Sequence, residues 1–107
     1  MTRMKKPLKN INIIHSLNRD FENRIRLGIM SVLMVNEWVD FLEMKNFLDI
    51  TDGNLASHIA ALEKKEYVEI KKQFEGKKTK TSYRITPLGR SDFLEHLNAL
   101  EKLLNNK

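Results

Sequence analysis

The chain has 107 residues, with no cysteine, one tryptophan and 41% hydrophobic residues, a composition that suits one compact domain. The lack of cysteine excludes disulfides, thiolate metal sites and thiol redox chemistry. The longest uncharged apolar stretch, residues 27–35, is about half the roughly 20 residues that a membrane span needs. The basic residues 1–9 are not followed by the apolar core of a secretory signal. We therefore expect a soluble, cytoplasmic protein with no membrane partner.

The charged side chains are unevenly distributed along the chain. Residues 1–26 carry seven basic and two acidic side chains, residues 27–63 carry one and six, and residues 64–90 carry nine and three. Two basic regions around an acidic middle favour a polyanionic partner that binds at defined places. A solvated, lysine-rich surface is the alternative, and charge alone does not decide between the two.

In chain order, a basic leader precedes a short helix over residues 8–17, where apolar residues recur at helical spacing. A longer apolar pattern predicts a helix over residues 19–35. Gly28 interrupts that pattern, and since glycine in a helix costs about 1 kcal/mol relative to alanine, we expect a close helix crossing there. Residues 37–39 are predicted to be a short extended segment.

Two short helices joined by a tight turn follow. Asp40 is predicted to cap a helix that runs to residue 48, with Glu43 as its capping-box partner. Thr51 is predicted to cap the next helix. That helix places one apolar stripe inward, formed by Leu55, Ile59 and Leu62.

The apolar spacing then changes to that of strands. Residues 67–74 alternate apolar and polar side chains, residues 76–80 contain the glycine of a loop, and residues 81–85 favour a strand again. These runs predict a β-hairpin. Thr86 and Pro87 then predict a helix start, and the helix runs to about residue 104.

This order predicts a mainly α fold with a small β-hairpin wing, that is, a winged helix-turn-helix. The single domain comprises a basic leader with a short helix (1–18), a winged-helix core (19–86) and a C-terminal dimerisation helix (87–107). A helix-turn-helix inserts its second helix into the major groove of DNA.

Three passages, residues 24–30, 51–68 and 85–90, resemble small prokaryotic winged-helix transcriptional regulators of the MarR/ArsR type. The first, RIRLGIM, resembles the opening of the first core helix of these families. The second, from TDGNLASHIAALE to the start of the wing, is similar to their recognition helix. The third, ITPLGR, resembles the junction between wing and dimerisation helix. The resemblance implies a homodimer that binds double-stranded DNA.

The chain departs from the metal-sensing members of these families. It has no cysteine pair, and Asp92 and His96 lie one helical turn apart with no second histidine after them. We therefore expect no metal site and no cofactor.

Given this fold, the exposed side of the recognition helix carries the residues that would read DNA. Asparagine pairs bidentately with adenine, and serine or histidine bonds to base edges or phosphates. A glycine lets the helix N-terminus approach a phosphate. The alternative is that these are ordinary solvent-facing side chains. The predicted contacts are Gly53, Asn54, Ser57, His58 and Lys64.

The wing carries the residues predicted to hold the DNA backbone. Lysines at a hairpin tip bind phosphates and give affinity without sequence information. Lysines that protect an edge strand from aggregation are the alternative. Lys5, Lys6 and Lys9 could add a basic arm or form a solubilising tail, which the sequence leaves open. The predicted wing contacts are Lys72, Lys77, Lys78, Lys80 and Arg84.

The last helix has more apolar surface than one small domain covers, which favours a dimer. A helix folded back on its own core is the alternative. A small-molecule effector would bind between the first core helix and the terminal helices, near Phe21, Ile25, Phe93 and Leu97, although these residues serve equally as dimer core. The predicted dimer interface comprises Ile11, Ile14, Phe93, Leu97, Leu100 and Leu104.

The sequence thus predicts a sequence-specific DNA-binding transcriptional regulator, a homodimeric repressor that acts by occlusion. The alternative is a winged-helix module that binds protein, which the acidic middle segment favours. No grouping of residues for nucleophilic or paired-carboxylate catalysis is found, so an enzyme is not expected. Trp38 is predicted to pack in the core or sheet, and His15 and His96 to lie at the surface or an interface.

Overall fold

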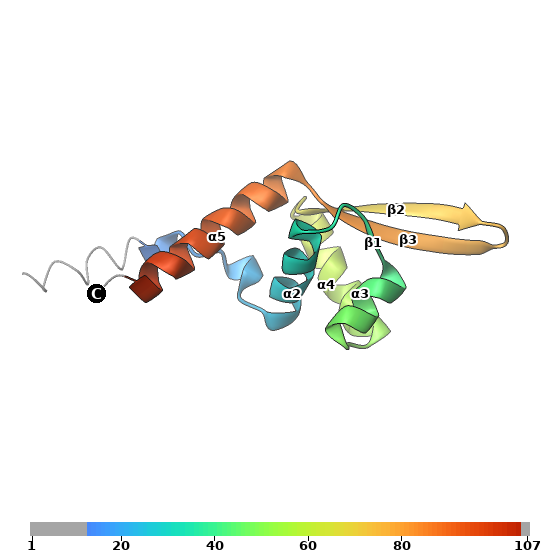
Figure 1. Cartoon of the computed structure of the whole chain (residues 1–107), viewed down its shortest axis with the longest axis horizontal. Coiled ribbons are helices and arrows are strands. Elements are labelled where there is room, and N and C mark those ends of the chain that lie inside the picture. The colour runs from blue at the N-terminus through green and yellow to red at the C-terminus, as the bar shows by residue number, and fades with distance from the viewer. Residues whose placement is uncertain (1–12, 106–107) are drawn as a thin grey trace, which may run out of the picture.

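The computed structural model describes residues 13–105 and forms a winged helix (Figure 1). Residues 13–15 are helical, and the start of the helix predicted over 8–17 lies outside the described residues. The elements that follow are η2 (Arg19–Phe21), α2 (Arg24–Met34), β1 (Val39–Asp40), α3 (Phe41–Leu48), α4 (Asp52–Lys64), β2 (Val68–Glu75), β3 (Lys78–Ile85) and α5 (Pro87–Asn105).

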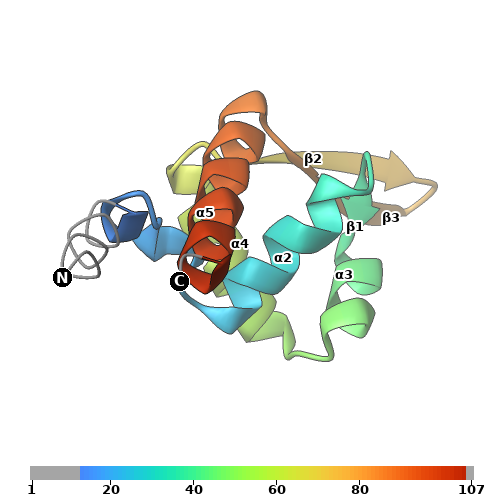
Figure 2. The same cartoon turned by 60° about the vertical axis from the view of Figure 1, so that its left-hand side comes forward.

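The single helix predicted over residues 19–35 is wrong, because two asparagines divide it. Asn18 caps the 3-10 helix η2, accepting a hydrogen bond from the backbone N–H of Asp20. Asn23 has extended backbone angles and accepts from the N–H groups of Ile25 and Arg26, so α2 begins anew at Arg24. The break separates η2 from α2, and η2 packs through Phe21 on Phe93 of α5 (Figure 2).

The predicted caps of the later helices are confirmed. Asp40 and Glu43 form a reciprocal capping box, with side chain to backbone distances of 2.8 and 3.1 Å. Thr51 Oγ1 accepts from the backbone N–H of Asn54 at 3.2 Å. Thr86 Oγ1 accepts from the N–H of Gly89 at 2.9 Å. These local signals fix where α3, α4 and α5 begin.

The wing is longer than predicted. Strands β2 and β3 pair in register from Val68 with Ile85 to Glu75 with Lys78, which leaves only residues 76–77 as the loop. Gly76 has a φ of 65°, a conformation that glycine adopts at low cost. Strand β1 pairs with β3 to complete a three-stranded sheet in the order β1-β3-β2. The far half of the wing projects beyond the helices, opposite the end to which α5 extends (Figure 1).

The core lies where α2, α4, the base of the wing and α5 meet. Its largest fully buried side chains are Phe21, Phe93, Ile29, Met30, Leu33, Met44, Leu55 and Leu62. The predicted close crossing at Gly28 is confirmed, because a Cβ atom there would lie 2.8 Å from a methyl group of Leu48 on α3. Within residues 13–105, no helix is both long enough and apolar enough to cross a bilayer.

His96 is buried, contrary to the surface or interface position predicted for it. It is 3% exposed, and its Nδ1 accepts a hydrogen bond from the backbone N–H of Asn18 at 2.9 Å. Burial lowers the pKa of His96 below its usual value of 6.5, partly opposed by the charge of Glu22. The folded protein therefore holds this histidine neutral, with its Nδ1 lone pair in use.

This burial predicts a loss of stability on acidification. The unfolded histidine takes up a proton near pH 6.5, whereas the folded one resists protonation until a lower pH. The unfolded state therefore binds more protons in that window, and the free energy of unfolding falls as pH decreases from about 7.5 to about 5.5. Urea unfolding at several pH values measures this fall.

Asparagine at position 96 keeps a hydrogen-bond acceptor but does not titrate, so H96N should reduce the dependence on pH. H15N, at an exposed histidine, controls for the loss of one histidine. An H96N variant with the slope of the native protein would contradict the role assigned to His96.

Candidate nucleic-acid interface

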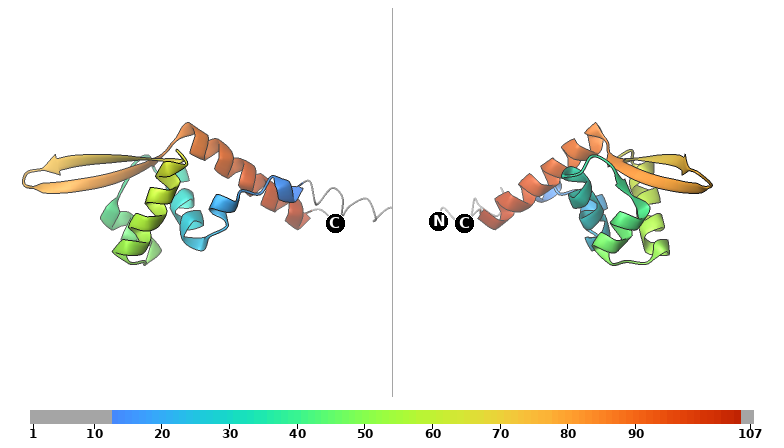
Figure 3. Two further views of the ribbon diagram at one scale, coloured as in Figure 1. Left: turned by 180° about the vertical axis from the view of Figure 1, so that it is seen from behind. Right: turned by 45° about the vertical axis from the view of Figure 1, so that its right-hand side comes forward.

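Helix α4 lies in the second position of the helix-turn-helix, with one long side exposed (Figure 3, left). Its buried side chains are Leu55, Ile59 and Leu62, as predicted. Four of the predicted DNA contacts are exposed and face away from that stripe, namely Gly53, Asn54, Ser57 and Lys64. A Cβ atom at Gly53 would meet nothing within 4 Å, so the N-terminal turn of α4 is open to an approaching ligand.

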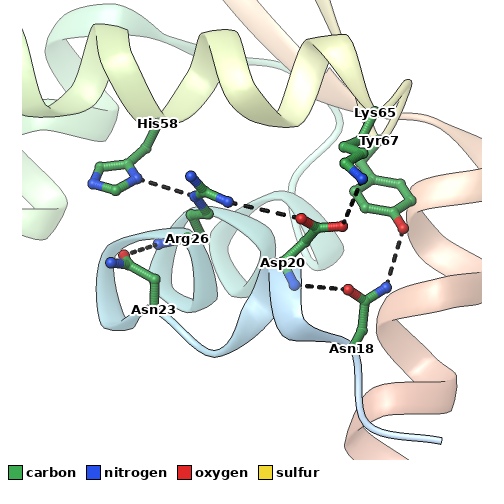
Figure 4. Close-up of polar contacts among 7 residues, drawn as sticks. All are labelled: Asn18, Asp20, Asn23, Arg26, His58, Lys65 and Tyr67. Carbon is green, nitrogen blue, oxygen red and sulfur yellow. Dashed lines mark hydrogen bonds and ion pairs between the residues drawn. The ribbon is translucent and has the colours of Figure 1, made fainter.

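His58 occupies a different position from the other predicted contacts of α4. It is half-buried on the flank of the helix that faces α2. Its Nδ1 accepts a hydrogen bond from Nε of Arg26 at 3.1 Å (Figure 4). Burial, and then the positive charge of Arg26, lower the pKa of His58 below 6.5. His58 is therefore neutral at pH 7 and is held in place by α2.

Arg26 belongs to a polar network that links α2 with η2 and with the end of α4 (Figure 4). Asp20 lies 3.9 Å from Nη1 of Arg26 and 3.7 Å from Nζ of Lys65, at the end of α4. Asn18 donates from its side chain to the hydroxyl of Tyr67 at 3.0 Å. These contacts could not be predicted from the sequence, because they join residues that are up to 49 positions apart. The asparagines that break the helix pattern were the available signal.

The wing lysines divide into free and paired groups. Lys72, Lys77 and Lys78 are exposed, and none of them forms an ion pair within the described part of the chain. Lys80 lies 3.5 Å from Glu75 and 3.9 Å from Asp40. Lys78 and Lys80 lie in β3 rather than in a loop, which differs from the prediction. Three positive charges in the outer half of the wing thus remain available to a polyanion.

Arg84, also predicted to contact DNA, is held within the sheet. Its Nη2 donates to both carboxylate oxygens of Glu69, at 2.9 and 3.1 Å. Its guanidinium lies 4.6 Å from the ring centroid of Trp38, and Nζ of Lys71 lies 4.1 Å from the same ring. Trp38 thus packs on the sheet, as predicted, and does so through cation–π contacts. This arrangement gives Arg84 a structural role at the base of the wing.

One exposed aromatic side chain near the wing tip was missed. Phe74 is 81% exposed. Strand alternation puts it on the same face as Val68 and Ile70, which pack at the base of the wing. The alternation could be seen in the sequence. The strand extends beyond the core, however, and so the outermost apolar residue of that face remains in solvent.

The residues predicted for the dimer interface divide into buried and exposed groups. Phe93 is 1% exposed and packs edge-to-face on Phe21, with ring centroids 5.1 Å apart, so it belongs to the core of its own chain. Leu97 and Leu104 are 36% and 76% exposed on α5. Leu100 is half-buried, Ile14 is 50% exposed, and Ile11 lies outside the described residues.

The position expected for a small-molecule effector is occupied by these same aromatic rings. Phe21 and Phe93 are in contact there, and Ile25 packs against the core. A groove of about 530 Å³ lies elsewhere, between residues 13–16 and α5, where Leu94, Asn98 and Lys102 are among its lining residues.

The sequence of this chain matches known proteins over most of its length. Residues 25–104 match the family described as a winged helix DNA-binding domain. An uncharacterized protein of Methanocaldococcus jannaschii is 34% identical over 86 residues, which cover 80% of this chain and 94% of the relative.

Solved structures of transcriptional regulators share the fold. A transcriptional regulator homologue from Pyrococcus horikoshii superposes with a TM-score of 0.78 at 27% identity, covering 94% of this chain and 95% of that one. BpsR of Bordetella bronchiseptica, whose DNA binding is regulated by 6-hydroxynicotinic acid, gives a TM-score of 0.68 at 12% identity over 96% of this chain and 78% of its own. NadR, solved with 4-hydroxyphenylacetate, gives a TM-score of 0.68 at 17% identity, covering 97% of this chain and 71% of that one.

The matched residues contain the whole helix-turn-helix, the wing and most of α5. The fold and the resemblance expected from the sequence are thereby confirmed. The chain belongs to the winged helix DNA-binding domain family, and its fold is that of transcriptional regulators of the MarR type.

Proposed function

We propose that this protein is a homodimeric transcriptional repressor that binds a pseudo-palindromic site in double-stranded DNA. In this proposal α4 enters the major groove, and Asn54 and Ser57 contact base edges. Lys72, Lys77 and Lys78 hold the phosphate backbone. The observation that carries the proposal is the combination of an exposed polar face on α4 with three exposed wing lysines on a regulator fold. Repression follows from occlusion of the site, and the protein needs no catalytic role.

The acidic middle of the chain does not oppose DNA binding, because much of its charge has a structural use. Asp40 and Glu43 cap α3. Asp52 lies 2.7 Å from Nζ of Lys45, and Asp49 ends α3 in the left-handed conformation. The carboxylates of Asp40, Glu43 and Asp52 thus have partners within the helix-turn-helix. The segment therefore gives less support to a protein-binding module than its charge alone suggests.

Alanine at Asn54 and Ser57 is expected to reduce discrimination between DNA sequences. The double variant N54A/S57A should lose roughly tenfold or more in affinity for a duplex selected by the native protein, because base contacts specify the site. Binding to random duplex should change little, because phosphate contacts supply it. N46A, at an exposed asparagine of α3, serves as the matched control. An equal loss on both kinds of duplex would argue against base reading by α4.

The exposed leucines of α5 support the dimer. Leu94, Leu97 and Leu104 are 43%, 36% and 76% exposed, and Ile14 beside this helix is 50% exposed. A second copy of the chain would cover these side chains through a two-fold axis. The resulting dimer presents two recognition helices roughly 34 Å apart, one turn of DNA. This spacing is why we propose a pseudo-palindromic site.

Charged substitutions on this surface are expected to separate the two chains. L97E/L104E should be monomeric by solution mass, and it should bind a two-half-site duplex roughly a hundredfold more weakly because the gain from bivalency is lost. L42E, at a leucine of α3 that is 64% exposed, controls for added charge. Deleting residues 91–107 is a poor test, because it would remove the core residue Phe93. An L97E/L104E variant that stays dimeric would move the interface elsewhere.

A further inference from the structure

The contact between Arg26 and His58 determines which ring nitrogen of His58 carries a proton. Nε of Arg26 is 3.1 Å from Nδ1 of His58. An arginine guanidinium remains charged and only donates hydrogen bonds. Nδ1 must therefore accept with its lone pair and carries no proton. A neutral imidazole then has its single proton on Nε2.

Arg26 is itself held in place, so this contact is built into the fold. It lies in the first turn of α2, where its backbone N–H is capped by Asn23 at 3.2 Å. Its Nη1 lies 3.9 Å from Asp20, whose other carboxylate oxygen lies 3.7 Å from Lys65. The charged groups in this network around His58 are thus Arg26 of α2, Asp20 of η2 and Lys65 at the end of α4. A second proton on His58 would break the bond from Arg26 and place two cations together.

Of the two ring nitrogens of His58, Nε2 is the one that forms no hydrogen bond within the described residues. Nε2 lies on the side of the ring away from Arg26 (Figure 4). His58 is one helical turn beyond Asn54 and next to Ser57, both of which are exposed. A histidine at this place thus borders the exposed face of the recognition helix and offers one hydrogen-bonding group to it.

We propose that Arg26 is a positioning residue that fixes His58 as the Nε2–H tautomer, so that α4 presents a hydrogen-bond donor to an acceptor on the DNA. This inference rests on the proposed DNA binding. The acceptor is either a phosphate oxygen or the N7 or O6 atom of a purine in the major groove. The opposite tautomer would present the lone pair of Nε2 to the DNA. Phosphate oxygens repel a lone pair, whereas the amino groups of adenine or cytosine donate hydrogen bonds to it.

The first arm of the test measures the tautomer in the free protein. Long-range proton–nitrogen NMR correlation of labelled histidine distinguishes protonated from unprotonated ring nitrogens, and H58A assigns the signals among the three histidines. The native protein should show His58 with protonated Nε2 and unprotonated Nδ1. R26M removes the donor and should yield a mixture of tautomers. R24M, which removes an exposed arginine two residues earlier, should leave His58 as in the native protein.

The second arm measures affinity for a duplex selected by the native protein, as a double-mutant cycle. H58A should weaken binding roughly tenfold in the native background, the value of one hydrogen bond to a charged or buried partner. In the R26M background the same substitution should cost threefold or less, because His58 no longer presents a fixed donor. If R26M acted only by removing a positive charge, H58A would weaken binding equally in both backgrounds. R24M measures the effect of removing one positive charge separately.

Modified duplexes identify the acceptor. A methylphosphonate at one phosphate at a time removes a charged oxygen, and a 7-deazapurine at one position at a time removes N7. The contacted atom is the one whose modification weakens binding by the native protein but not by H58A.

A His58 protonated on Nδ1, or equal costs of H58A in both backgrounds, overturns the role of Arg26 while the proposed function stands. Failure to bind any duplex overturns the proposed function and the DNA contact together, and leaves the tautomer measurement to decide the role of Arg26.

Discussion

Alanine at Lys72, Lys77 and Lys78 is expected to weaken binding to every duplex, selected or random, by roughly a hundredfold near physiological salt. The three side chains are exposed on the projecting wing and form no ion pair within residues 13–105. DNA binding releases one fewer counterion for each phosphate contact that is lost. The slope of log affinity against log salt should therefore become shallower by about 0.9 per contact. A salt titration of the triple variant measures both effects.

Lys80 gives the matched control for this prediction. It lies on the same strand as Lys78, but it is 3.5 Å from Glu75 and 3.9 Å from Asp40. Its charge is already partly neutralised, so K80A should reduce the slope by less than the average of the three free lysines. If the triple variant bound random duplex like the native protein, the exposed lysines would have only the role of edge protection.

The second large effect is expected from Gly89→Ala, which should destabilise the fold by about 3 kcal/mol. Gly89 is the third residue of α5, and a Cβ atom there would overlap the backbone carbonyl oxygen of Tyr67. That carbonyl accepts from the N–H of Thr86 at 3.0 Å, so it is fixed at the point where α4, the wing and α5 meet. Because backbone meets backbone, no side-chain rotation relieves the overlap, and the overlap outweighs the gain of about 1 kcal/mol in helix propensity.

Two other helical glycines calibrate this effect in urea unfolding. G53A should be neutral or stabilising by up to about 1 kcal/mol, because a Cβ atom there meets nothing within 4 Å. G28A should lie between the two, because the atom that it meets at 2.8 Å is a methyl group of Leu48, which can rotate. A G89A variant as stable as G53A would refute the close contact between α5 and Tyr67.

The sequence predicted the structure correctly wherever an element's conformation depends on its own residues. Asp40, Thr51 and Thr86 sit directly before the turns that they cap, so their roles follow from residue type and spacing. The alternation in the wing likewise predicted the hairpin. The order of these elements was enough to predict the winged helix.

The errors arose where the outcome depends on a distant part of the chain. The apolar spacing of residues 19–35 continued through Asn23, although its cap divides the helix. Apolar periodicity on α5 did not reveal that Phe21 of the same chain covers Phe93, while Leu97 and Leu104 stay exposed. Periodicity shows which residues share an apolar face, and only tertiary packing shows which of them are covered and by what.

The candidate site shows the same limit. The residue types of α4 and the wing identified the surface, but not which side chains are free. Arg84 is bound by Glu69, fifteen residues away, and His58 by Arg26, thirty-two residues away. Neither pairing has a local signal. Both leave a basic or polar residue of the interface with a structural partner, which changes what it offers to DNA.

Binding of the native protein to a random 30-base-pair duplex over a salt series, with the mass of the free protein and of the complex recorded, tests the central claim most directly. We expect a free protein of two chains, two chains in each complex, and an affinity that falls steeply as salt rises. Absence of binding at low salt would contradict it and would favour a winged-helix module whose partner is a protein.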